Sequence, residues 1–112
     1  MAEIQENINL SGTTLLTGGA AAGATVINLG VVPSDGALVS AVVSSSADDS
    51  GVTYTLEVNG TLVPGTSTTG GGANTAVTLS PTGGATTVSA GDRVTVTAST
   101  SVGETGATAT LN

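Results

Sequence analysis

Apolar and polar residues alternate along most of this chain with the period of two that is typical of β-strands. The clearest stretch is 52–58, which ends at an Asn-Gly pair, a strong signal for a tight hairpin turn. The pattern predicts a strand over 52–58, a turn at Asn59-Gly60 and a short strand at 61–63. The side chains expected to face inward in the long strand are Val52, Tyr54, Leu56 and Val58.

Similar patterns recur along the rest of the chain, separated by Gly, Pro, Asp and Ser. They predict strands at 24–32, 37–45, 75–80, 86–89, 93–100 and 107–111. The side chains expected to face inward are Ile27, Leu29, Val31, Ala37, Val39, Ala41, Val43, Val77, Leu79, Val94, Val96, Ala98, Ala107, Ala109 and Leu111. Residues 33–36 are expected to turn, 46–51 to form a polar loop, and 64–74 to form a long Gly-rich loop that is the most mobile part of the chain.

The N-terminal stretch differs from the rest. Residues 4–10 place Ile4, Ile8 and Leu10 on one face, which Glu6 interrupts, so we expect an edge strand or an arm on a neighbouring subunit. Residues 11–23 are rich in Gly, Ala and Thr and predict no helix. The organisation expected is an N-terminal arm or edge segment at 1–23 and a β-sandwich domain at 24–112. The fold class is all-β, an antiparallel β-sandwich of about eight short strands, either jelly-roll or immunoglobulin-like.

The composition excludes most kinds of catalytic and metal-binding sites. The 112 residues contain no Cys and no His, and Arg93 is the only basic residue. Catalytic triads, Cys nucleophiles, lysine Schiff bases and His or Cys metal sites all need residues that are missing. We therefore expect no enzyme and no cofactor. Phe and Trp are also absent, so the core is expected to be thin and to gain stability from assembly.

Charge excludes two further classes of partner. The formal net charge is −7, which disfavours nucleic acid, whose binding depends on Lys and Arg. Anionic membranes are disfavoured for the same reason. The N-terminus has neither a basic region nor an apolar core of the kind found in signal peptides, so synthesis in a host cytoplasm is expected.

Few residues are candidates for a site. Asp48 and Asp49, with Asp35 and Glu104 from other loops, could hold Ca²⁺, although solvated loop charges are the favoured interpretation and we expect no metal. Asp92 is expected to accept backbone N–H groups in a turn.

Of two further side chains, Tyr54 has one expected role, whereas the role of Arg93 is open between two. Arg93 could pair with an acid or be solvated. Tyr54 is expected to lie in the core, with its hydroxyl reaching a partner at the edge of the sandwich. A glycan-binding platform would need several exposed aromatic residues.

Two stretches, 24–63 and 75–100, carry a family resemblance. They combine an apolar strand, a Pro/Asp-Gly turn, "YTLEVNGT" and "VSAGDRVTVTAST". This order of strand and turn motifs resembles the small β-sandwich modules of tailed-bacteriophage virions, which occur as capsid decoration (cement) proteins and in head and tail fibres. The resemblance covers about residues 24–100, and immunoglobulin-like domains of bacterial surface proteins share some of it. No catalytic residue is implied.

The resemblance implies a viral structural protein on the outer capsid surface of the virion, often a homotrimer, whose partner is the major capsid protein. A decoration protein of this kind clamps adjacent shell subunits after expansion. Ile4, Ile8, Leu10 and Arg93 are the candidate interface residues. The alternatives are a receptor- or glycan-binding module of a phage fibre, using the loops 46–51 and 64–74, and an adhesin-like bacterial surface domain.

Overall fold

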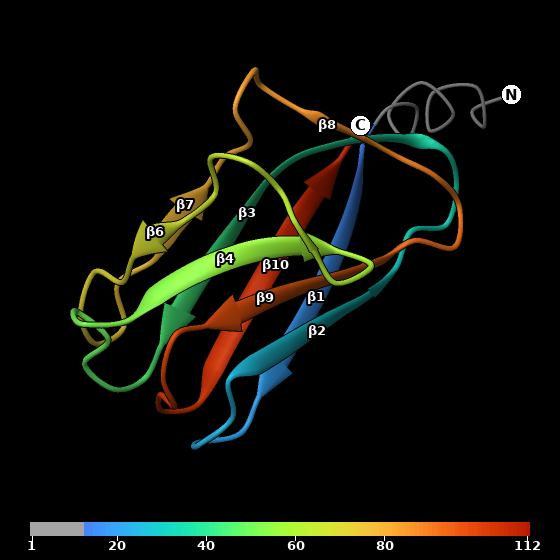
Figure 1. Cartoon of the computed structure of the whole chain (residues 1–112). Helices are drawn as coiled ribbons and strands as arrows, with labels where there is room; N and C mark the ends of the chain where they lie inside the picture. The colour runs from blue at the N-terminus through green and yellow to red at the C-terminus, as the bar shows by residue number, and fades with distance from the viewer. Residues whose placement is uncertain (1–12) are drawn as a thin grey trace, which may run out of the picture.

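The computed structural model describes residues 13–112, which fold into two antiparallel sheets packed face to face (Figure 1). Sheet A contains five strands: β1 (Thr14–Ala20), β10 (Thr105–Leu111), β3 (Gly36–Ser45), β7 (Val77–Leu79) and β8 (Thr86–Val88). Sheet B also contains five: β2 (Val26–Val31), β9 (Arg93–Ala98), β4 (Thr53–Val58), β5 (Thr61–Leu62) and β6 (Thr68–Thr69). The all-β sandwich expected from the alternating pattern is confirmed.

The strand order identifies the sandwich as a jelly roll. Sheet A runs β1-β10-β3 and then β7 or β8, which pair with different halves of β3. Sheet B runs β2-β9-β4 and then β5 or β6, which pair with the two ends of β4. The first four strands alternate between the sheets, and the last two return to lie inside the first two. This is a jelly roll of eight strand positions, two of which are divided between short strands.

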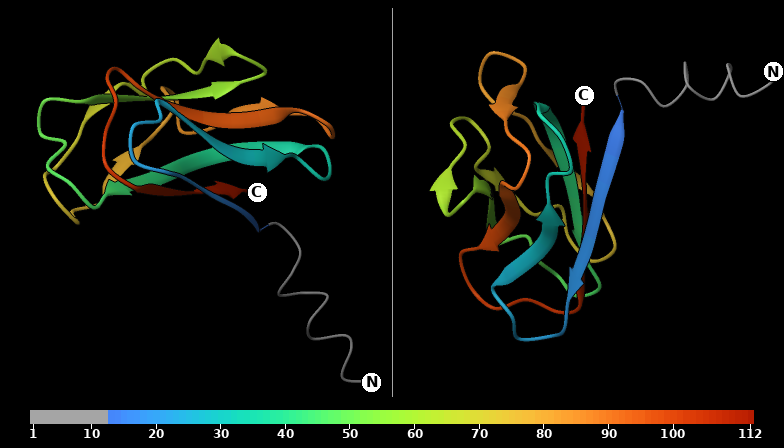
Figure 2. Two further views of the ribbon diagram at one scale, coloured as in Figure 1. Left: turned by 90° about the horizontal axis from the view of Figure 1, so that it is seen from below. Right: turned by 90° about the vertical axis from the view of Figure 1, so that its right-hand side faces the viewer.

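Side chains from the inner faces of both sheets fill the core. Figure 2 shows the two layers that enclose it in two further views. The inward positions expected in β4, β9 and β10 are confirmed, since Tyr54, Val96 and Ala109 are fully buried. Most core residues are Val, Leu, Ile and Ala, so the distance between the sheets is filled by aliphatic side chains and one aromatic ring. The buried hydrophobic residues are Ile27, Leu29, Val32, Leu38, Ala41, Val43, Val52, Tyr54, Leu56, Val63, Leu79, Val88, Val94, Val96, Ala98, Ala107, Ala109 and Leu111.

Two β-bulges reverse the expected orientation of side chains in β2 and β3. The pairing of β2 with β9 skips one residue between Asn28 and Gly30, so Val31 is 45% exposed and Val32 is buried instead. The pairing of β3 with β10 skips Val39, so Leu38 is buried in the first half of the strand. The inward predictions for Val31, Ala37 and Val39 were therefore wrong. A bulge adds a residue to one strand and moves every later side chain to the other face.

The edge strand β1 lies within the segment 1–23 and belongs to sheet A, where it pairs with β10 over its full length. Its backbone also approaches β2 of the other sheet. A Cβ placed on Gly18 would collide with the backbone carbonyl of Asn28. Glycine at this position therefore lets the two sheets close against each other along one flank of the sandwich.

Candidate functional surface

The outer face of sheet A carries no charge. None of its five strands contains Asp, Glu, Lys or Arg, and the side chains that point outward are Thr, Ser, Val and Leu, with two glycines. Register places them in rows across the sheet. The central row runs from Thr17 through Thr108 and Val42 to Thr78. The sheet therefore presents a flat, uncharged surface in a strongly acidic chain.

A hollow of about 560 Å³ crosses one end of this face. It forms where Gly19, Gly106 and Ser44 stand in one cross-strand row, because two of the three have no side chain. Asn74 and Glu104 stand at its rim and supply polar groups. The hollow is open, and it lies beside the central row, with Glu104 as the charged residue at its rim.

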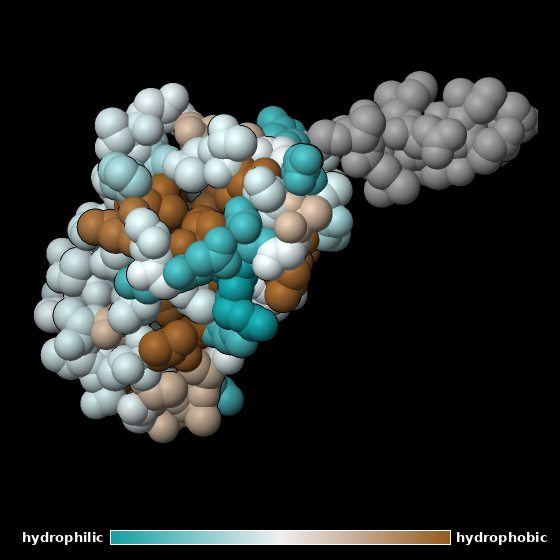
Figure 3. Space-filling model, turned by 45° about the vertical axis from the view of Figure 1, so that its right-hand side comes forward, coloured by the Kyte–Doolittle hydropathy of each residue, from teal (hydrophilic) through white to brown (hydrophobic). Residues whose placement is uncertain are grey.

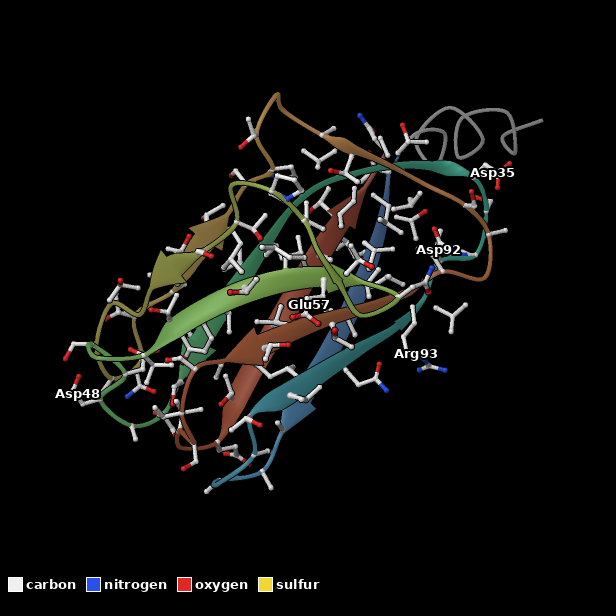
Figure 4. The ribbon with its side chains drawn as sticks, viewed as in Figure 1. Asp35, Asp48, Glu57, Asp92 and Arg93 are labelled. Atoms are coloured by element: carbon white, nitrogen blue, oxygen red, sulfur yellow. The ribbon has the colours of Figure 1, made fainter. Side chains whose placement is uncertain are left out.

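The outer face of sheet B is different in character. In the part of the chain that the structure describes, five large hydrophobic residues are exposed, and three of them project from strands of this sheet: Val26, Val31 and Leu62. The face also carries Glu57 and Arg93, both labelled in Figure 4. In Figure 3 brown apolar patches lie on both sides of a teal hydrophilic band. Sheet B is thus the charged face of the sandwich and sheet A the uncharged one.

A buried carboxylate joins three segments at one end of the sandwich. Asp49 is fully buried, and the Tyr54 hydroxyl donates a hydrogen bond of 2.6 Å to its Oδ2 atom. The backbone N–H of Gly72 donates to its Oδ1 atom at 2.8 Å. Burial, the hydrogen bond that the Tyr54 hydroxyl donates to Asp49 and the nearby charge of Asp49 raise the pKa of Tyr54 far above its ordinary value. The arrangement is structural, because both carboxylate oxygens are committed to the loop 46–51, β4 and the Gly-rich loop.

Sequence reasoning assigned Tyr54 correctly and Asp49 wrongly. The expected core tyrosine with a hydroxyl partner is confirmed, and that partner is Asp49, which was expected to be a solvated loop charge. The Gly-rich loop 64–74 contains the short strand β6, and Thr66 and Gly70 in it are buried. Its mobility stays a prediction.

The turns at the other end are held by carboxylates that accept backbone hydrogen bonds. Ser89 N–H donates to Asp92 at 2.8 Å, and the Asn59 side-chain amide donates to the same carboxylate at 3.0 Å. These two hydrogen bonds lower the pKa of Asp92. The turn role expected for Asp92 is confirmed. Asn59 has a φ of 53°, and Gly60 has a φ of 81°, as the expected Asn-Gly hairpin requires.

The acidic residues of the described segment do not gather into a metal site. Asp35 and Asp48 lie at opposite ends of the sandwich in Figure 4. In residues 13–112 no group of three potential ligands stands close enough to hold a metal ion. Asp48 is an exposed loop charge as expected, and the backbone N–H of Ser50 lowers its pKa. Four of the described acids, Asp35, Asp48, Asp49 and Asp92, instead accept backbone hydrogen bonds in turns and loops.

Of the four candidate interface residues, only Arg93 lies in the described part of the chain. It is exposed at the start of β9, and its backbone N–H donates to the Asn59 side chain at 2.9 Å. Ile4, Ile8 and Leu10 lie outside the described residues. Residues 13–112 contain no helix long and apolar enough to span a lipid bilayer. Sequence reasoning missed the uncharged outer face, whose signal is the absence of charge from five separate strands.

Searches with the sequence find no matching family model and no curated relative. Solved structures with a similar fold do exist. A chain of the acid-stable capsid of the Helicobacter pylori bacteriophage KHP30 aligns with a TM-score of 0.53 and 14% identity, over 90% of this chain and 86% of that one. The C-terminal CBM6 module of LamC, a marine laminarinase from Zobellia galactanivorans, aligns with a TM-score of 0.51 and 16% identity, over 89% and 99%.

A third similar structure is the GH26-CBM35 β-(1,4)-mannanase of Podospora anserina, with a TM-score of 0.52 and 10% identity over 90% of this chain. This chain spans 28% of the mannanase chain, so the likeness concerns one part of that enzyme. At these identities the comparisons establish the β-sandwich fold. They associate that fold with both a phage capsid and carbohydrate-binding modules, and a shared fold does not by itself assign a function.

Proposed function

We propose that this chain is a capsid decoration protein, which binds the outside of an expanded phage shell through the uncharged outer face of sheet A. The observation that carries the proposal is the segregation of charge. All charged residues in 13–112 lie on sheet B or in loops: Asp35, Asp48, Asp49, Glu57, Asp92, Arg93 and Glu104. Charged residues are depleted at the centres of protein interfaces, because desolvating them is costly.

The dimensions of the face support a protein partner. Seven-residue strands such as β1 and β10 are about 24 Å long, and four strand positions span about 19 Å. The flat area is therefore about 450 Å², against about 800 Å² per partner in a standard interface. One copy of the face fills about half of a standard contact, and repetition over many copies on a shell multiplies its effect.

The proposed mechanism is passive. A sandwich that rests on the joint between two shell subunits binds only when those subunits hold their expanded positions. Selective binding stabilises that state by mass action and opposes the outward pressure of packaged DNA. The acidic surface left facing outward keeps the particle soluble. The similar fold and length of the chain from the KHP30 capsid support this assignment, because that chain is part of a capsid.

The test is binding to expanded shells that lack this chain, measured by co-sedimentation. Val42→Asp places a carboxylate at the centre of the sheet A face, where Val42 is 40% exposed. Burying that unpaired charge costs about 2–5 kcal/mol, so binding should weaken at least about thirtyfold. Thr55→Asp is the matched control on the outer face of sheet B. Unchanged binding of Val42→Asp, or an equal loss of binding by Thr55→Asp, contradicts the proposal.

A second candidate is carbohydrate binding, which the hollow at Gly19, Gly106 and Ser44 favours. An open polar depression can accept sugar hydroxyl groups, and two of the structural neighbours contain carbohydrate-binding modules. The buried position of the only tyrosine argues against it, because sugar rings stack on exposed aromatic side chains. Titration with laminarin and with β-(1,4)-mannan, followed by NMR, decides the matter. Shifts confined to Ser44, Asn74 and Glu104 would favour this candidate, and absence of shifts would remove it.

A further inference from the structure

The four edges of this sandwich differ in how well they are protected against pairing with another strand. The edge of sheet B at β2 is interrupted by a bulge. The opposite edge of sheet B is formed by β5 and β6, of two residues each. The far edge of sheet A is formed by β7 and β8, of three residues each. Short strands and bulges are the devices by which proteins prevent edge-to-edge association.

The fourth edge, β1, has none of these devices. It is seven residues long, pairs with β10 without a register shift, and contains no proline and no charge. It is the last strand in the order of sheet A, so one side of its backbone has no strand partner within residues 13–112. Leu15 is 59% exposed on it, the highest value among the large hydrophobic side chains of the described residues. Figure 2 (right) shows β1 running along the flank of the molecule.

We propose that β1 is the docking edge for a second copy of this chain, which pairs its own β1 antiparallel to the first. Such a pair has a two-fold axis perpendicular to the sheet, so the contact is isologous and closes after two copies. The backbone N–H and C=O groups of one edge then satisfy those of the other. Thr17, at the centre of the strand, faces the same residue of the second copy.

Charge identifies the second copy as the occupant. Each chain carries a net charge of −7, so two copies repel unless they meet where charge is lowest. Sheet A is the uncharged sheet, and β1 is its only long open edge in the described part of the chain. A second β1 is neutral in the same way and matches this edge in length and regularity. A basic partner strand would find no acidic side chain on β1 to pair with.

Pairing at β1 has one consequence that rests on the proposed function. The perpendicular two-fold axis keeps the outer faces of both A sheets on the same side. Two areas of about 450 Å² then form one uncharged platform of about 900 Å², which reaches the size of a standard contact with a partner. The structure favours an even-numbered assembly, whereas the family resemblance implies trimers.

The test is the mass of the purified full chain in solution, by analytical ultracentrifugation from low to high micromolar concentration. We expect a monomer–dimer equilibrium. Thr17→Asp and Thr17→Lys each place like charges across the two-fold axis and should weaken dimerisation at least tenfold. An equal mixture of the two variants should restore it, because opposite charges then face each other. Thr78→Asp is the control, since Thr78 stands in the same row of the same face, on β7.

Each other result has a defined meaning. A wild-type chain that stays monomeric, or one that forms trimers, overturns the pairing. A dimer that Thr17→Asp and Thr78→Asp weaken equally, or that the mixture does not restore, places the contact elsewhere. A chain that dimerises only after deletion of residues 1–12 shows that its own N-terminus covers the edge, which also overturns the inference. None of these results depends on a capsid, so failure here is separable from failure of shell binding.

Discussion

Replacing Tyr54 with Phe removes a single oxygen atom from the core and leaves one carboxylate oxygen of Asp49 without its hydrogen-bond donor. The lost bond is 2.6 Å long and joins two fully buried side chains. A hydrogen bond to a charged acceptor contributes about 1.5–3 kcal/mol, and a buried acceptor left unsatisfied costs a similar amount. We expect Tyr54→Phe to lower the free energy of unfolding by about 2–3 kcal/mol. For a domain of this size the melting temperature falls by roughly 10–15 °C.

The assay is urea denaturation followed by circular dichroism, because the substitution removes the only aromatic fluorophore. Asp49→Asn and the double variant complete a mutant cycle, which isolates the coupling between the two side chains. Asp48→Asn is the matched control. Asp48 is exposed, and an amide oxygen can accept the same hydrogen bond from Ser50, so it should change stability by less than about 0.5 kcal/mol. A Tyr54→Phe variant within about 0.5 kcal/mol of wild type refutes the reasoning.

Three further predictions concern pH and packing. Because the folded state raises the pKa of Tyr54, the free energy of unfolding should be constant below about pH 10 and decline above it. Tyr54→Phe should remove this decline. Phenolate absorbance reports the titration of Tyr54, and urea midpoints report the stability. Because the folded state lowers the pKa of Asp92, its contribution should hold above about pH 4 and fade as the pH falls further, and Asp92→Asn should flatten that acid limb of the urea midpoint. Gly18→Ala should lower the free energy of unfolding by about 1–3 kcal/mol, measured by urea denaturation, because the new Cβ meets the Asn28 carbonyl. Gly106→Ala should be nearly neutral, because a Cβ has room there. Equal effects of the two variants would contradict the close approach of the sheets.

The alternating pattern was sufficient to predict most strands and the fold class. It worked best in β4 and β9, which pair with each other without a register shift, because every second residue then faces the core. It failed at the bulges in β2 and β3. A bulge depends on pairing with a distant strand, and the local sequence around Val39 contains no sign of it. Gly30, with a φ of 114°, was the one local signal available in β2.

Strand β1 and the role of Asp49 were beyond a local reading for different reasons. β1 has the sequence "TLLTGGA", and one of its inward positions is Gly18. The reason for glycine there is the close approach of the other sheet, which the local sequence does not show. Asp49 looks like its neighbour Asp48 in sequence, and only the fold separates a buried carboxylate from an exposed one. The partner of Asp49 at Gly72 is 23 residues away along the chain. Such contacts need the three-dimensional arrangement.

The central claim is that this chain decorates a capsid, and the number of copies per particle tests it most directly. Quantitative mass spectrometry of purified virions gives the molar ratio of this chain to the major capsid protein. The account predicts many copies, in a simple ratio to the shell subunit, because every equivalent joint presents the same site. A handful of copies per particle, as a fibre or tail tip would give, or complete absence from particles, contradicts it.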